Sequence, residues 1–240
     1  MSRAGSAAGK SLARQNTAVP SGRFRRACAA WLDLLWPPRC ILCHRILEDG
    51  TERLCPACRA ALPEPFSGAR RGGFYKRWAA ALWYEGTVRE SFLRFKFGGC
   101  RFYAAVYGPW LARAVREQLG TDFELLTYVP VSPLRRRRRG FDQTLLLARE
   151  AGAALGMEPV PTLRKKNRVK PQSRALGPEE RQRNVRGAFR VPDPELVRGK
   201  RVLLIDDVLT TGATVSEAAR VLLEAGAKRV DAATLAATPG

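Results

Sequence analysis

Residues 202–214 read Val-Leu-Leu-Ile-Asp-Asp-Val-Leu-Thr-Thr-Gly-Ala-Thr, and no other stretch constrains the architecture as strongly. The apolar run 202–205 is typical of a strand buried on both faces, as strands of parallel sheets are. Outward from it, strand-like runs alternate with helical patterns, which predicts an α/β fold with a parallel sheet flanked by helices. Strands are expected at 79–84, 124–131, 201–206 and 230–235, and helices at 87–97, 102–119, 142–155 and 214–225.

Two carboxylates stand at the end of this strand, directly before a loop of small residues. Asp206 and Asp207 follow the apolar run, and the loop 210–214 contains three threonines and Gly212. The backbone N–H groups of such a loop, with the N-terminus of the next helix, bind phosphate. The combination fits a phosphorylated sugar whose ribose hydroxyls bond the acids directly or through Mg²⁺. The alternative, an ordinary strand-to-helix turn with a capping residue, explains one acid poorly and two acids worse.

Four of the six cysteines form two Cys-x-x-Cys pairs separated by eleven residues: Cys40, Cys43, Cys55 and Cys58. This spacing is typical of a tetrahedral Zn²⁺ site, and a site with four protein ligands is structural. Two disulfides or a redox-active pair are the alternatives. Because residues 36–65 are too few to form a core alone, metal is expected to supply the folding free energy of this segment. His44, the single histidine, is expected to be a solvated loop residue.

Composition changes divide the chain into four parts. We expect a disordered leader at 1–22, a zinc-ribbon-like module at 23–65, a linker at 66–77 and a large domain at 78–240. The best apolar stretch, 27–36, is much shorter than the roughly 20 residues that cross a bilayer, and it contains Asp33. The sequence therefore predicts a cytoplasmic protein without a membrane span.

The chain of 240 residues is strongly basic, with 42 Lys and Arg against 22 Asp and Glu and a formal charge of +20. With 45% hydrophobic residues, it fits neither a disordered chain nor a small disulfide-bonded peptide. Basic residues concentrate at 135–139 and 164–190. A single histidine argues against a Ser-His-Asp or Cys-His hydrolase. The charge is compatible with a nucleic-acid partner.

Aromatic and basic residues interleave at 70–78, as in a surface that binds single-stranded DNA by stacking and phosphate contacts. The alternative is that the aromatic side chains begin the core of the large domain. We favour this alternative for Trp78 and leave it open for Phe74 and Tyr75. The interleaved basic residues are Arg70, Arg71, Lys76 and Arg77.

The thirteen residues 202–214 resemble the phosphoribosyl pyrophosphate (PRPP) motif of type I phosphoribosyltransferases. The wider pattern resembles the ComF family in its cysteine quartet and in three further motifs. These are Phe95-Lys96-Phe97-Gly98, Val129-Pro130-Val131 and Arg139-Gly140-Phe141-Asp142-Gln143. The resemblance implies a type I phosphoribosyltransferase fold behind a small zinc-binding module.

The resemblance also implies roles for particular residues. Asp206 and Asp207 would be the catalytic acids that contact the ribose hydroxyls, with Mg²⁺ bridging ribose and pyrophosphate. The 5′-phosphate would be bound by Thr210, Thr211, Gly212, Ala213 and Thr214. Pyrophosphate would be bound by a loop and a lid over 164–186, with Pro130, Val131, Ser132, Arg139, Arg174 and Arg181 as the candidate residues.

The implied reaction transfers a phosphoribosyl group from PRPP to a nitrogenous acceptor. Thr210 stands where purine-type relatives place an aspartate general base, which leaves the acceptor and its base undetermined. ComF relatives are linked to DNA uptake during natural transformation. This link adds two alternatives: a non-catalytic adaptor that binds single-stranded DNA or a competence helicase, and a regulator that senses PRPP. A homodimer also remains open.

Overall fold

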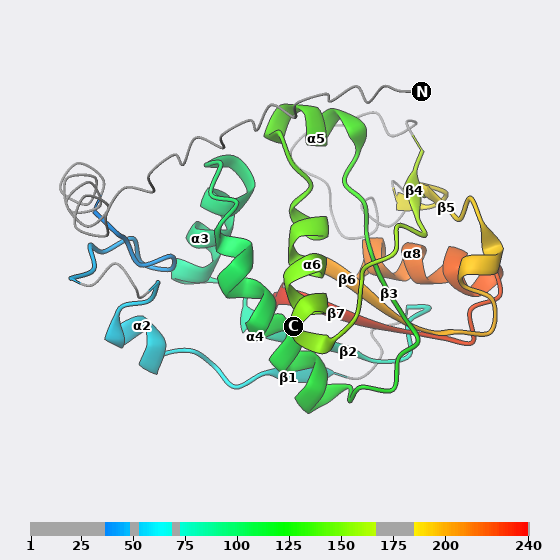
Figure 1. Ribbon diagram of the computed structural model, residues 1–240, viewed down its shortest axis with the longest axis horizontal. Coiled ribbons are helices and arrows are strands. Elements are labelled where there is room, and N and C mark those ends of the chain that lie inside the picture. The colour runs from blue at the N-terminus through cyan, green and yellow to red at the C-terminus, as the bar shows by residue number, and fades with distance from the viewer. Residues whose placement is uncertain (1–36, 49–52, 69–72, 167–184, 240) are drawn as a thin grey trace, which may run out of the picture.

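A computed structural model describes residues 37–48, 53–68, 73–166 and 185–239 of the chain. Its centre is a five-stranded sheet with the order β1-β2-β7-β6-β3 (Figure 1). β1 (Phe66–Gly68) pairs antiparallel with β2 (Trp78–Trp83). The other neighbours are parallel, and they include β3 (Leu125–Tyr128), β6 (Arg201–Leu209) and β7 (Arg229–Ala237). The predicted parallel α/β sheet is thus confirmed.

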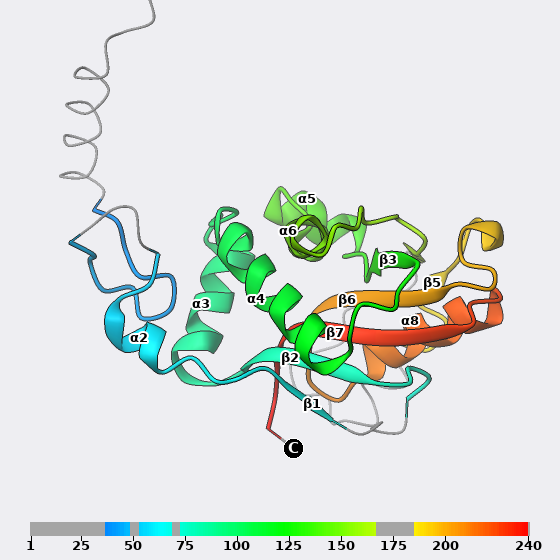
Figure 2. The same ribbon diagram turned by 60° about the horizontal axis from the view of Figure 1, so that its bottom comes forward.

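Helices cover both faces of the sheet. Figure 2 shows α4 (Tyr103–Gln118) and α6 (Gln143–Leu155) on one side and α8 (Ala213–Glu224) on the other. Successive side chains of a strand point to opposite faces, and β6 follows this rule. Leu203 and Ile205 pack in the α4–α6 core, whereas Val202 and Leu204 pack in the α8 core. A continuous apolar run therefore serves two cores at once.

The remaining elements are short or lie at the edges. The helix α5 (Pro133–Arg139) was not expected, because a run of arginines carries no amphipathic pattern, yet its ends are well specified. Ser132 accepts a hydrogen bond from the Arg135 N–H, Pro133 occupies the first turn, and Gly140 ends the helix at φ 77°. The full set of short or peripheral elements is α2 (Pro56–Ala60), α3 (Gly86–Phe97), α5 (Pro133–Arg139), β4 (Arg164–Lys165), β5 (Phe189–Arg190) and the 3₁₀ turn Pro194–Leu196.

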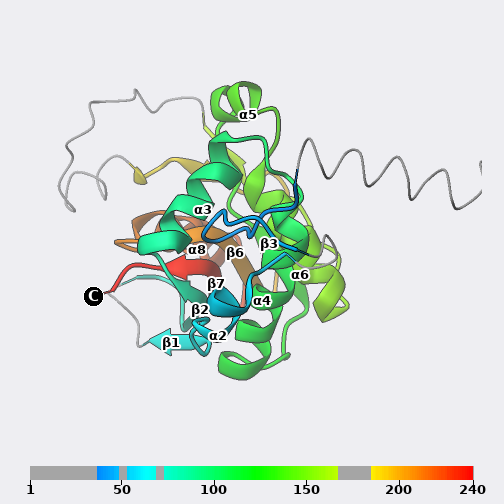
Figure 3. The ribbon, with the colours of Figure 1, turned by 90° about the vertical axis from the view of Figure 1, so that its left-hand side faces the viewer.

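The cysteine-rich segment packs against α3 and α4, as Figure 3 shows. Its buried residues Cys40, Ile41 and Leu42 join the same apolar core as Phe95 of α3 and Leu111 of α4. The segment is small, but it completes its core with side chains of the large domain. The sequence predicted that metal supplies the folding free energy of this segment. In the structure, burial against the large domain contributes as well.

Several expected boundaries differ from the structure. Residues 66–68, expected within a linker, form β1, because Phe66 stacks on Trp83 at 3.7 Å between ring centroids. Tyr75, from the same segment, is fully buried, as is Trp78, whereas Phe74 is exposed. The core interpretation therefore holds for Tyr75 and Trp78 and not for Phe74. Arg70 and Arg71 lie outside the described residues, as does the expected leader.

Two strands also end at other residues than the sequence predicted. β3 is shorter than expected and ends at Tyr128, whereas β6 continues past the acid pair to Leu209 because β7 runs alongside it. The acids therefore lie within the strand and not at its tip. Within the described residues, no helix has the length and apolar character needed to cross a membrane.

Candidate functional site

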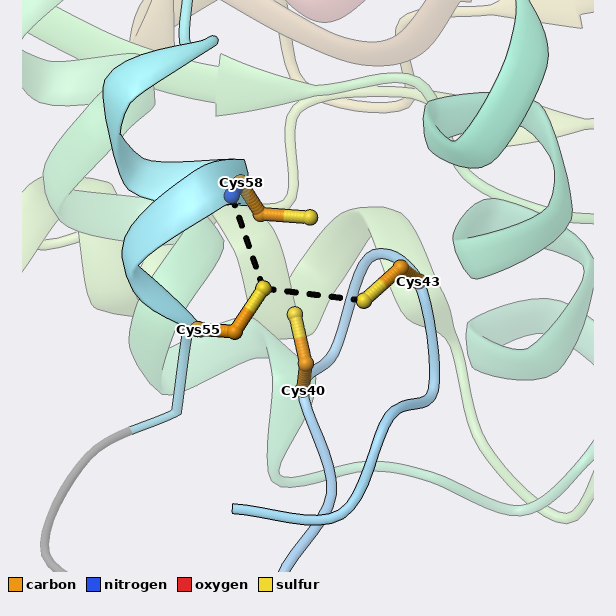
Figure 4. Close-up of side chains that lie close together, drawn as sticks. All are labelled: Cys40, Cys43, Cys55 and Cys58. Atoms are coloured by element: carbon orange, nitrogen blue, oxygen red, sulfur yellow. Dashed lines mark hydrogen bonds between the residues drawn. The ribbon is translucent and has the colours of Figure 1, made fainter. Parts of the chain in front are cut away.

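The four predicted cysteines come together at one point, as Figure 4 shows. Their sulfur atoms all lie within 4.8 Å of one another. The Sγ atoms of Cys43 and Cys55 are 3.7 Å apart, and the Cys58 N–H donates to the Cys55 Sγ at 3.4 Å. All four are free thiols, which disfavours the two-disulfide alternative. Four thiols around one point suit structural Zn²⁺.

The four thiols differ in proton affinity, which matters because thiolates and not thiols are metal ligands. Burial acts to raise the pKa of Cys40, but backbone N–H groups of Cys55 and Cys43 outweigh it and lower the pKa to about 7. Burial and the neighbouring thiols raise the pKa of Cys58. His44 is exposed and is not part of the cluster, in line with the sequence prediction.

Polar contacts fasten the cysteine segment to the large domain. The Ile41 carbonyl accepts hydrogen bonds from the Ser91 hydroxyl and from Arg94 Nη2, the latter at 3.1 Å. The Leu42 carbonyl accepts from the same Arg94 nitrogen at 2.5 Å. Ser91 also bonds the Tyr107 hydroxyl of α4 at 2.5 Å. No motif in the sequence pointed to these contacts.

The acid pair lies at a step in the sheet. β3 pairs with β6 only as far as Ile205, opposite Tyr128, whereas β7 continues alongside Asp206 and beyond. Asp206 and Asp207 therefore lie just past the last residue that β3 pairs. In open α/β sheets, ligands bind beyond the carboxyl ends of strands, and this step opens such a position.

Each acid has different neighbours, as strand alternation requires. Asp207 lies on the α4–α6 face, where its Oδ2 accepts from Lys96 Nζ at 2.8 Å and from Gln143 Nε2 at 3.0 Å. Asp206 Oδ1 accepts from the backbone N–H of Asp207 at 2.8 Å. The family motifs around Lys96 and Gln143 thus meet at one carboxylate, although the sequence gave neither residue a role.

The two carboxyls differ in proton affinity. Burial, with repulsion from Asp207, raises the pKa of Asp206 to about 8. Burial acts in the same direction on Asp207, but the charge and hydrogen bond of Lys96 outweigh it and lower the pKa of that carboxyl. Near neutral pH the pair therefore holds a proton on Asp206 and a negative charge on Asp207.

A second cation, Lys165 of β4, interacts electrostatically with both acids. Its side chain is half-buried, with Nζ 5.3 Å from the centre of the Phe189 ring. Burial lowers the pKa of Lys165, as does the charge of Arg135, whereas both acids oppose this shift. The sequence placed Lys165 in the stretch expected to form a lid, but gave it no role.

The loop 210–214 has the geometry of a phosphate-binding turn. Gly212 has φ 74° and gives α8 no side-chain cap, and the Ala213 N–H donates to the Thr211 hydroxyl at 3.4 Å. The N–H groups of the first turn lack helical carbonyl partners. A Cβ on Gly212 would lie 2.8 Å from the Tyr75 hydroxyl oxygen. Glycine is therefore required here both by its backbone angle and by the close approach of Tyr75.

The residues predicted for pyrophosphate lie near the acid pair. Pro130, Val131 and Ser132 follow β3, and the Val131 N–H donates to Asp142 Oδ2 at 3.2 Å, which ties this loop to the start of α6. Arg139 lies at the end of α5, with its guanidinium 4.9 Å from the centre of the Phe97 ring. Arg174 and Arg181 lie outside the described residues.

An open cavity of about 400 Å³ adjoins the acid pair between α3 and α5. Among the described residues, its arginines form no ion pair with a carboxylate, so their charge is available to an anion. Lys96 connects the cavity with the acid pair, because its side chain lines the cavity and its Nζ contacts Asp207. The lining residues are Tyr84, Leu93, Lys96, Phe97, Arg135, Arg138 and Arg139.

A parallel sheet with an acid pair, followed by a phosphate-type turn and preceded by a four-thiol site, defines a phosphoribosyltransferase-fold protein with an N-terminal zinc-binding module. Comparison with known families agrees: the phosphoribosyl transferase domain matches residues 145–240, and the double zinc ribbon domain matches residues 31–70. The chain belongs to the ComF family.

Three relatives carry this assignment. DNA utilization protein YhgH of Salmonella typhimurium is 36% identical over 199 residues, covering 80% of this chain and 86% of that protein. Competence protein ComFC of Streptococcus pneumoniae is 29% identical over 199 residues, covering 80% and 84%. Competence protein F of Haemophilus influenzae is 28% identical over 214 residues, covering 80% and 93%.

Proposed function

We propose that this protein binds PRPP with Mg²⁺ and transfers its phosphoribosyl group to a nitrogenous acceptor, in the context of DNA uptake. The observation that carries the proposal is the acid pair within β6, followed at once by the turn at Gly212 and the uncapped start of α8. The names of the relatives, which refer to competence and DNA utilization, support the context.

The site divides into parts that match the parts of PRPP. Asp206 and Asp207 accept hydrogen bonds from the ribose hydroxyls, and the amides at the start of α8 hold the 5′-phosphate. Three arginines of α5 line the cavity beside Lys96, and the loop 130–132 leads into that helix, so the diphosphate of the same molecule would extend there. The order of carboxylates and cations therefore follows the charge pattern of the substrate.

Carboxylate oxygens are the ligands that Mg²⁺ takes together with substrate phosphates, so the acid pair fits this ion. When bound, Mg²⁺ would neutralise charge on the departing diphosphate. The protein's own contribution is to orient C1 of the ribose through the acids and to stabilise the diphosphate with guanidinium groups as the C1–O bond breaks. A nitrogen of the acceptor forms the new bond to C1, and its proton leaves to a base that the described residues do not identify.

Calorimetric titration of PRPP with Mg²⁺ tests this proposal. Wild-type protein should bind, and the double variant Asp206→Asn, Asp207→Asn should bind at least a hundredfold more weakly, because two acceptors for the ribose hydroxyls are lost. Glu158→Gln, on the exposed surface, is the matched control and should bind as wild type. Retained affinity in the folded double variant would refute the site.

Turnover is tested separately from binding. With PRPP, Mg²⁺ and a panel of nitrogenous bases, release of pyrophosphate should depend on one class of acceptor and disappear in the double variant. PRPP binding without release for any acceptor would leave the PRPP-sensing regulator as the better description of this protein.

A second candidate function is a nucleic-acid or helicase-binding adaptor. It is favoured by the exposed face of α5, where arginines form no ion pair with a carboxylate of the described chain, and by the net charge of +20. Its affinity for single-stranded DNA should fall steeply with salt and with the variant in which Arg135, Arg136 and Arg137 become Gln. Binding that salt does not weaken would count against it.

A further inference from the structure

Lys96 lies between the two matched domains, which span residues 31–70 and 145–240. It occupies the last turn of α3, two residues beyond Arg94, which holds the carbonyls of the cysteine segment. Its Nζ lies 4.6 Å from the centre of the Phe92 ring, and the side chain is only 16% exposed. The ammonium group is therefore held at a defined place.

That place is shared between two features of the site. Lys96 Nζ lies 2.8 Å from Asp207 Oδ2, on the same oxygen that accepts from Gln143. The same side chain lines the cavity whose other cations are Arg135, Arg138 and Arg139. An ammonium on a flexible four-carbon stem has three donors and can exchange partners without backbone movement.

Binding of a ribose to the acid pair would change which donors bond the Asp207 carboxylate. In the structure, Lys96 and Gln143 satisfy one oxygen of this carboxylate, and the positive charge of Lys96 compensates it. A ribose hydroxyl that bonds Asp207 adds a further donor to the same carboxylate and so weakens its hold on Lys96. A diphosphate in the cavity would at the same moment present several negative oxygens to Lys96, which makes the exchange of partners favourable.

We propose that Lys96 is a diphosphate-binding residue: its ammonium pairs with Asp207 in the structure described here and pairs with the diphosphate in the PRPP complex, where ribose hydroxyls replace it on Asp207. This inference rests on the proposed binding of PRPP. It assigns substrate recognition to α3, which precedes the matched phosphoribosyl transferase stretch 145–240.

The test uses calorimetry on the full chain with inorganic pyrophosphate and ribose 5-phosphate as separate probes. Lys96→Met should bind pyrophosphate at least tenfold more weakly, while its affinity for ribose 5-phosphate stays equal or rises, because Asp207 no longer has a competing partner. Lys96→Arg should recover most of the pyrophosphate affinity. Lys200→Met, placed just before the opposite end of β6, is the matched control and should bind both probes as wild type.

A second variant predicts the opposite sign and does not rely on the folding of Lys96→Met. Asp207→Asn frees the ammonium, so it should bind pyrophosphate severalfold more tightly and ribose 5-phosphate more weakly. Adding Lys96→Met to Asp207→Asn should remove the gain. A gain that persists in this double variant would mean that the missing negative charge alone causes it, and would overturn the inference.

The outcomes separate this inference from the proposed function. If wild type binds PRPP with Mg²⁺ but Lys96→Met binds pyrophosphate normally, the role of Lys96 is wrong and the PRPP site stands. Equal losses for both probes in Lys96→Met would indicate a structural role and also overturn it. If wild type binds neither PRPP nor pyrophosphate, the proposed function and the inference fail together.

Discussion

The cysteine cluster and the acid pair both gather ligand-type side chains, yet they are built in opposite ways. The four thiols face one another, and Ile41 and Leu42 beside them are buried in an apolar core. The acid pair interacts with cations, and an open cavity adjoins it. A closed set of four ligands leaves no position for a substrate, whereas the open cavity beside the acids has room for one.

The difference predicts how each region responds to change. Damage to the cluster should appear first in stability, because the thiols and their neighbours belong to the main core. Damage to the acid pair should appear first in ligand binding, and replacing Asp206, whose burial disfavours its charged form, should stabilise the fold at high pH. The four predictions below test this division in order of expected size.

The largest effect is expected for Cys55→Ser with Cys58→Ser. Metal content should fall from about one Zn²⁺ per chain to none, and the cysteine segment should unfold, because metal binding on the order of 10 kcal/mol contributes to its folding. Metal analysis and thermal denaturation measure both. Cys100→Ser, whose thiol lies outside the cluster and donates to the Gly98 carbonyl at 3.5 Å, should change neither. A metal-free double variant with unchanged thermal stability would contradict the prediction.

Next in size is the effect of Asp206 on the pH dependence of stability. Its folded-state pKa is raised from 3.8 to about 8, so the folded protein binds the extra proton between these values. The corresponding stability is complete below pH 4 and is lost as pH rises through 8. Asp206→Asn should therefore raise the free energy of unfolding by several kcal/mol more at pH 9 than at pH 5. Urea unfolding at the two pH values measures this.

Asp207→Asn is the matched comparison. The pKa of Asp207 is lowered, so its contribution is present above 3.8 and is lost only as pH falls through the lower folded-state value. Its substitution also removes the repulsion that raises the pKa of Asp206, so it should raise stability at pH 9 relative to pH 5, but by less than Asp206→Asn does. If the two variants show the same pH dependence, the assignment of proton and charge within the pair is wrong.

A smaller effect is expected where the two regions are joined. Arg94→Met leaves the Ile41 and Leu42 carbonyls without their guanidinium donor, which should lower the free energy of unfolding by about 2 kcal/mol. Chemical denaturation measures it, with Arg89→Met on the exposed side of the same helix as the control. Equal effects of the two substitutions would show that these contacts contribute nothing specific.

The smallest effect on stability is expected for Gly212→Ala. Its positive φ costs an alanine about 1 kcal/mol, and the new Cβ meets the Tyr75 hydroxyl. Adding Tyr75→Phe should restore the part that comes from this contact and leave the backbone part. Thermal denaturation of the two variants separates these contributions. Full stability in Gly212→Ala alone would mean that the turn relaxes freely.

The parts of the molecule that the sequence predicts best are those in which neighbouring residues act together. The spacing of Cys40, Cys43, Cys55 and Cys58 requires only local turns to bring four thiols to one point. The strand around Leu203 and the glycine turn after it likewise follow from local pattern. In such cases the motif itself contains most of the geometry.

The parts that sequence could not supply depend on contacts between distant residues. Lys96 meets Asp207 across more than a hundred residues of chain, and Ser91 bonds a carbonyl fifty residues away. Tyr75 looked like a linker residue because its partner, Gly212, lies far along the sequence. Neither periodicity nor spacing encodes such pairs, which the packing of α3 and of the segment before β2 determines.

The alternation of side chains along β6 places two identical residues in unlike environments. Asp207 faces Lys96 and Gln143, whereas Asp206 lies on the side of Leu204 and the α8 core. Deleting one residue from 202–205 would shift the register by one and send each carboxylate to the other face. The Asp-Asp dipeptide would read unchanged, yet the proton and the negative charge would have traded positions. An alignment would score such a deletion as a single gap next to an intact motif, although the two acids had exchanged roles.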